Sequence, residues 1–267
     1  MIVRSTDTEE LILIPQTDHS KLVGQLMAHW GNENFARPEP FDSVVRAAAC
    51  HDFGWIPYES RPLFDAERGE TPHYLFVANS TAQLKAYQDC TDWLTAVDPY
   101  ASLLVNMHRT GLWQRRYDVI AHPKAYLHPK GRLPMQPTEE VKTFMAKNEA
   151  IQARQRAGLD EAQVWTNYRL LQVCDLLGLY FSCQEPDELY ITPVPTAYTG
   201  NKSEGLTMTV KPVGTRVVAF EPFPFRVPNI HVGLQGKRLS SRKYPNPDAF
   251  MAAYFQAEPE TFVFTLV

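Results

Sequence analysis

Histidine and aspartate residues recur on the apolar faces of four segments with helical periodicity. These residues are His19, the adjacent pair His51 and Asp52, His108 and Asp175. Any one inward histidine is most simply a hydrogen-bonded core residue, and an inward aspartate usually pairs with a cation, here Arg109 or Arg169. Three imidazoles and two carboxylates together are costly to bury unless a cation lies among them. Because both groups are natural ligands of a divalent ion, the pattern indicates metal chemistry.

Asp52 gives a separate indication of a metal. It falls in the last turn of a predicted helix over 42–53, with Gly54 as the predicted stop. The helix dipole disfavours a negative charge at that end, and metal coordination would reverse the penalty.

The elements that must position these residues follow from hydrophobic periodicity. Helices are predicted near 18–30, 42–53, 80–96, 99–112, 138–157 and 160–183, with Pro-rich loops at about 56–78 and 121–137. Short strands are predicted at 2–4 and 10–14, and past Pro186 four β-branched and aromatic runs read as strands: GLTMTVKP, TRVVAF, NIHVGLQG and ETFVFTLV.

We therefore expect a mainly α fold in a single domain over residues 1–267. Its helical bundle would span about 16–184, and a small β appendage would span about 186–267, which strands from 1–15 can join.

Composition limits the partners. The formal net charge is −4 in 267 residues, which argues against a nucleic-acid polymer or a membrane surface as the partner. No apolar run approaches the roughly 18–20 residues of a membrane helix, and the acidic N-terminal segment does not resemble a signal peptide. The four cysteines form no CxxC pair, so we expect reduced thiols in a cytoplasmic protein.

The order of the polar motifs resembles the HD-domain phosphohydrolase superfamily, whose pattern is H…HD…D on a helical bundle. The motifs are QTDHS around His19, AAACHDFGW around His51 and Asp52, and LLQVCDLLGLY around Asp175, and the resemblance covers roughly residues 16–184. The motifs QTDHS and HDFGW also resemble those of a bacterial family of that superfamily, which shares the β-rich tail and has no established reaction.

The resemblance implies a ligand set and a reaction. His19, His51, Asp52 and Asp175 would hold one divalent ion (Mn, Fe, Zn, Ni, Co or Mg), with His108 as a ligand of a second ion or a substrate contact. His122 and His128 are further candidates for a second ion. The expected reaction is hydrolysis of a small phosphate ester or nucleotide by a metal-bound hydroxide, with Asp52, His108 and Arg109 in catalytic roles.

Two alternatives remain at this stage. One is an HD-fold di-iron oxygenase, for which a second site built from His108 and a loop histidine would be the basis. The other is a non-enzymatic HD-like protein that binds a ligand. The sequence does not indicate the oligomeric state.

Overall fold

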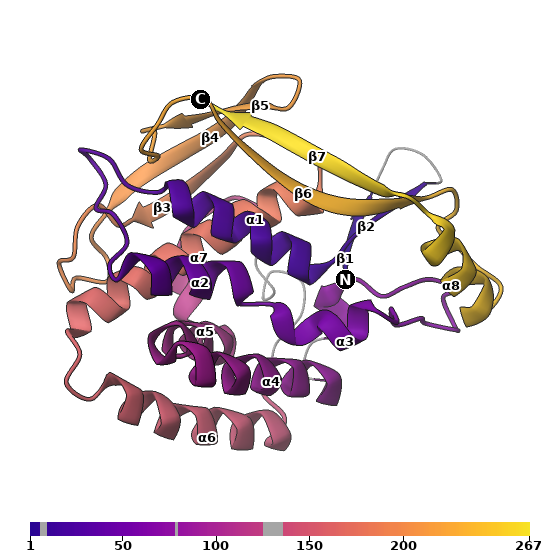
Figure 1. Cartoon of the computed structure of the whole chain (residues 1–267), viewed down its shortest axis with the longest axis horizontal. Helices are drawn as coiled ribbons and strands as arrows, with labels where there is room; N and C mark the ends of the chain where they lie inside the picture. Colours follow the sequence, from indigo (N-terminus) through magenta and orange to yellow (C-terminus); the bar gives the residue numbers. More distant parts are fainter. Residues whose placement is uncertain (6–9, 78–79, 125–135) are drawn as a thin grey trace.

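Seven strands form one mixed sheet that curls into a half-barrel over the helices. The computed structural model describes residues 1–5, 10–77, 80–124 and 136–267. About 49% of the chain is helical and 20% is strand. The expected mainly α bundle with a small β appendage, an all-α type of protein, is therefore wrong (Figure 1).

The sheet joins the two ends of the chain. Within the described residues its order is β1-β2-β6-β7-β5-β4-β3, and only the pairing of β5 with β7 is parallel. The strands are β1 (Ile2–Ser5), β2 (Leu11–Ile14), β3 (Leu189–Val194), β4 (Leu206–Gly214), β5 (Val217–Glu221), β6 (Ile230–Leu239) and β7 (Pro259–Leu266). Leu11 of β2 is paired with Leu239 of β6, so the N-terminal strands belong to the same sheet as the C-terminal ones.

In the part of the chain that the structure describes, six of eight α-helices coincide closely with predicted segments. The helices are α1 (Gln16–His29), α2 (Phe41–Cys50), α3 (Ile56–Glu59), α4 (Thr81–Val97), α5 (Pro99–Trp113), α6 (Glu139–Arg156), α7 (Glu161–Cys183) and α8 (Pro247–Gln256), with short 3₁₀ turns η1 (Phe53–Trp55), η2 (Tyr74–Val77) and η3 (Arg116–Val119). Because α2 ends at Cys50, Asp52 lies after the helix, and Gly54 belongs to η1 rather than forming a helix stop. Among the described residues, no helix is long and apolar enough to cross a membrane.

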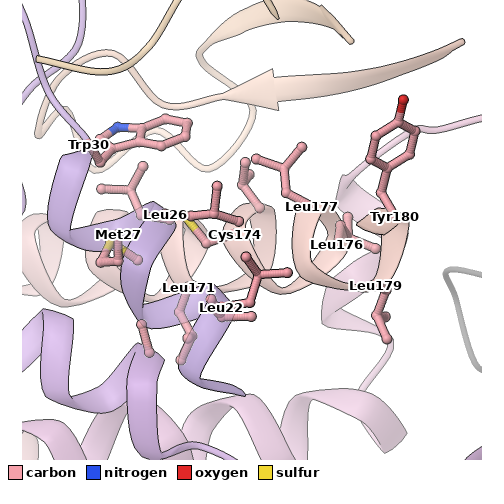
Figure 2. Close-up of a cluster of buried hydrophobic side chains, with 14 of the residues drawn as sticks. Leu22, Leu26, Met27, Trp30, Leu171, Cys174, Leu176, Leu177, Leu179 and Tyr180 are labelled. Atoms are coloured by element: carbon pink, nitrogen blue, oxygen red, sulfur yellow. The ribbon is translucent and has the colours of Figure 1, made fainter. Parts of the chain in front are cut away.

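One hydrophobic core includes both the helices and the sheet. The buried face of the sheet covers α1 and α7, while α4 and α6 lie on the side away from it (Figure 1). Figure 2 shows Leu22 and Leu26 of α1 in one cluster with Leu171 and Cys174 of α7. Gln25 of α1 also exchanges two hydrogen bonds with the backbone of Gly233 in β6, at 2.8 and 2.9 Å. The strands are thus a layer of the core, because their apolar face can be buried only against these helices.

Candidate metal centre

Three of the predicted ligands meet at one point in the interior. His19 lies on α1, His51 follows directly after α2, and Asp175 lies on α7. Among the described residues, these three each offer a ligand atom within 4.8 Å of the other two. His19 Nε2 is 2.9 Å from Asp175 Oδ1, and His51 Nε2 is 3.3 Å from the same oxygen. At most 8% of any of these residues is exposed, so the cluster is buried.

Glycines allow the helices that carry these ligands to approach one another. Gly178 lies one turn after Asp175 on α7, and a Cβ atom added there would be 2.7 Å from the His19 ring carbon Cε1. A Cβ atom at Gly24 of α1 would be 2.5 Å from the Cβ atom of Ala49 in α2. These contacts are too short for any side chain, so both glycines are needed for the observed position of His19.

The first turn of α1 is capped by a residue from another element. Its N-cap position is occupied by Pro15, which offers no side-chain hydrogen bond. The carboxylate of Glu59 in α3 instead accepts hydrogen bonds from the backbone N–H groups of Gln16 and Thr17 and from the Thr17 hydroxyl. A negative charge also suits this end of the helix dipole. This cap connects the segment that begins with His51 to the helix that carries the first ligand.

The ring of His51 presents an unpaired nitrogen to two carboxylates. Its Nδ1 lies 2.8 Å from the carbonyl oxygen of Ala48, and a carbonyl can only accept, so Nδ1 carries the proton. In the neutral ring, Nε2 then carries a lone pair. This nitrogen is buried, has no hydrogen-bond partner, and lies 3.3 Å from Asp175 Oδ1 and 3.4 Å from Asp52 Oδ2. Such facing acceptors repel one another unless a proton or a metal ion lies among them.

His108 of α5 repeats this arrangement. The Tyr117 hydroxyl donates to Asp175 Oδ2 at 2.8 Å, so its oxygen accepts from His108 Nδ1–H at 3.0 Å. The His108 Nε2 atom, 3.9 Å from Asp175 Oδ2, therefore also carries a lone pair. Burial lowers the pKa of His108 to about 3, which keeps the ring neutral near pH 7. Metal-binding histidines typically donate their other N–H to a fixed acceptor in this way.

Asp52 lies beside the three-residue cluster. Its Oδ1 atom accepts a hydrogen bond from the guanidinium of Arg109, which also donates to the carbonyl oxygen of His51. Arg109 lies over the ring of Tyr87, 4.1 Å from its centroid, and only 4% of the arginine is exposed. With Oδ1 used in this ion pair, Oδ2 is the Asp52 atom left to join the other ligands.

The ionisable groups of the centre shift one another's pKa values. Burial alone would raise the pKa of Asp175, but its interactions with His19 and His51 hold that pKa well below its usual range. Burial would likewise raise the pKa of Asp52, and the charge of Arg109 lowers it instead. For His51 burial acts to lower the pKa, but the two carboxylates outweigh it and the pKa is raised. Without a metal, His51 is therefore the residue best placed to take up a balancing proton.

Several functional residues lay beyond the sequence prediction. Tyr117, which is only 2% exposed, follows α5 in η3, and no sequence pattern marked it. Gly178 was detectable in principle, because a glycine inside a predicted helix indicates a close approach. Of the two loop histidines, His122 follows Ala121, whose backbone pairs with that of Thr192 in β3, and His128 lies outside the described residues.

Comparison with known proteins identifies one family. No curated protein and no solved structure matches the chain. One family model matches residues 1–241, a span that contains every residue of the candidate metal centre and ends before α8. The chain therefore belongs to the family DUF3891, which is described as a protein of unknown function.

Proposed function

We propose that the chain is a metal-dependent hydrolase of a small phosphate ester or nucleotide, in which His19, His51 and Asp175 hold one divalent ion. The observation that carries this proposal is the buried His51 Nε2 atom, which faces two carboxylate oxygens without a hydrogen bond. Two imidazoles with one or two carboxylates favour Mn, Fe, Co, Ni or Zn over Mg, which prefers oxygen ligands.

A proton on His51 alone is a weaker explanation of the centre. It would place an imidazolium between Asp52 and Asp175 and so balance part of their charge. It would not account for His108, a neutral ring whose lone pair also faces Asp175. A cation that accepts several lone pairs fits all of these atoms, and the H…HD…D resemblance supports the same ligand set.

Each residue of the centre has a role in the proposed reaction. A bound divalent ion would lower the pKa of a coordinated water and neutralise charge on phosphate oxygens. Arg109 orients Asp52, since its guanidinium is committed to that carboxylate and to the His51 carbonyl. Tyr117 fixes the tautomer of His108, so that the Nε2 lone pair faces the proposed ion site.

Elemental analysis of protein purified without added metal or chelator tests the metal site. We expect about one equivalent of a transition metal per chain, lost in His51→Ala. His231→Ala is the matched control, because His231 is exposed on β6. If His51→Ala kept as much metal as His231→Ala and the wild type, the result would contradict the site.

A separate assay of the loaded protein tests the reaction. Release of p-nitrophenol from p-nitrophenyl phosphate or its diester is expected for the wild type and the control, and its absence from His51→Ala. Loaded protein that hydrolyses neither ester would reject the hydrolase. Two irons per chain with oxygen consumption would identify the oxygenase instead.

We further propose that this activity is cytoplasmic. The four cysteines (Cys50, Cys90, Cys174 and Cys183) are all free thiols, which is typical of proteins kept under reducing conditions. Recovery of the native protein in an osmotic-shock extract or a secreted fraction would contradict this location.

A further inference from the structure

Basic side chains surround Trp165 near the start of α7. Lys202 Nζ lies 3.8 Å from the centroid of the Trp165 ring. The guanidinium carbons of Arg116 and Arg156 lie 5.4 and 5.5 Å from it. Arg169, one turn further along α7, lines a pocket together with Trp165 and Lys202. Arg156 is paired with Glu161, and the other three cations form a local concentration of positive charge in a chain of net charge −4.

The pocket lies between α7 and the segment that connects β3 to β4. Its hydrogen-bond donors are Arg169, Lys202, Thr166, Thr199 and Asn201. Its one acidic residue, Glu204, is solvent-exposed. A lining with two cations and three neutral donors favours an anion over a cation or an apolar ligand.

Among the described residues, Arg169 forms no ion pair with a carboxylate. It is only 5% exposed, and its hydrogen bond runs from Nη1 to the carbonyl oxygen of Arg116 at a long 3.5 Å. Burial lowers its pKa, and the groups that oppose this effect are Tyr168 and Tyr117, neither of them a carboxylate. A buried guanidinium without an anion is costly, so Arg169 indicates a ligand that supplies one.

We propose that this pocket binds a small oxyanion of the phosphate class through Arg169 and Lys202. The planar guanidinium can meet two oxygens of a tetrahedral anion at once. Lys202 is exposed and its stem is flexible, so its ammonium can leave the Trp165 ring and contact the anion. With Lys202 on the ring the free volume is about 20 Å³, enough for a water-sized group, so binding requires that movement. The site shares no lining residue with the metal centre and does not depend on the proposed hydrolase function.

Calorimetric titration of inorganic phosphate into chelator-treated full-length protein tests the site. The variants are Lys202→Ala and Arg169→Met, and the matched control is Lys211→Ala, which removes an exposed lysine of β4 outside the pocket. Loss of one charge-assisted contact should raise the dissociation constant for phosphate about tenfold in each pocket variant and leave that of the control unchanged. Lys202→Ala keeps the test decisive should Arg169→Met fail to fold.

Parallel titrations separate the sources of the anion and the two sites. Equal affinity for inorganic phosphate and phenyl phosphate would identify a free oxyanion, and tighter binding of phenyl phosphate would identify the phosphate group of a small molecule that also contacts Trp165. Either result supports the pocket when binding is about tenfold weaker in Lys202→Ala and unchanged in His51→Ala. Unchanged affinity in Lys202→Ala and Arg169→Met, binding that requires metal and His51, or no binding at all would overturn it.

Discussion

Helix α7 carries two buried charged side chains whose surroundings differ. Asp175 is 8% exposed, and His19 and Tyr117 contact its two oxygens at 2.9 and 2.8 Å. Arg169 is 5% exposed, and its hydrogen bond is a 3.5 Å contact to a backbone carbonyl. The carboxylate is held by short hydrogen bonds with buried side chains, whereas the guanidinium lies beside the exposed segment between β3 and β4 and forms no ion pair with a described residue.

A buried charge whose partners do not balance it can thus favour a bound metal ion at one site and an exchangeable anion at another. Around Asp175, the close approach of α1 at Gly178 fixes the donor atoms before any ion binds, which favours a resident metal. Around Arg169, Lys202 is exposed and must move, which favours a ligand that enters and leaves.

Asp175→Asn should have the largest effect. It removes the carboxylate on which the histidine Nε2 atoms converge, so we expect divalent-metal affinity to fall by at least about 100-fold. Metal titration monitored by competition with a chelating dye measures the change, and Asp92→Asn on the exposed face of α4 is the control. Folded Asp175→Asn protein that binds metal normally would end the metal interpretation.

Gly178→Ala should move His19 without changing any ligand. The new Cβ atom would lie 2.7 Å from the His19 ring, and overpacking of this kind costs about 1–3 kcal/mol. Urea unfolding measures the loss of stability. Gly214→Ala is the control, because a Cβ atom there makes an ordinary 3.5 Å contact. Equal midpoints for the two variants would show that α1 and α7 are not tightly packed at the centre.

Tyr117→Phe should weaken metal binding while the fold is kept. The change removes the hydrogen bonds that orient His108 and one oxygen of Asp175, and loss of such an outer contact typically lowers metal affinity about 10-fold to 100-fold. The same dye competition detects it. Tyr100→Phe, which removes a hydroxyl bonded to Asn167, should leave affinity unchanged.

Metal affinity should rise with pH. The pKa of His51 is raised in the metal-free fold, so at low pH a proton occupies the ring and competes with the ion. Apparent affinity should increase up to about tenfold per pH unit until the pH exceeds the pKa of His51, and then level off. Binding measured in buffers of different ionisation enthalpy should show proton release. Absence of proton release at every pH would show that His51 does not carry the competing proton.

Arg169→Met should have the smallest effect, and any change in the free energy of unfolding should be an increase. In phosphate-free buffer it removes an uncompensated buried charge, so the free energy of unfolding should stay the same or rise by about 1 kcal/mol. Added phosphate should then stabilise the wild type and not the variant, as thermal unfolding would show. Strong destabilisation without phosphate would mean that Arg169 is already satisfied within the fold.

The amino-acid sequence by itself determined the six long helices and the inward direction of four polar residues. Apolar spacing records which side of a helix is buried, so His19, His51, His108 and Asp175 could be placed in the interior without coordinates. β-branched and aromatic composition indicated most of the strands but not what covers them. The β region was therefore expected as an appendage, although β2 pairs with β6 and α1 packs beneath that sheet.

The tertiary structure alone decided how these polar residues meet. The proton position on His51 depends on the carbonyl of Ala48, and that on His108 depends on Tyr117. The ion pair of Asp52 with Arg109 and the lack of a counter-charge for Arg169 depend on which elements lie side by side. Periodicity is a local property of the chain, whereas these contacts depend on its path through space, which is why only the folded structure shows them.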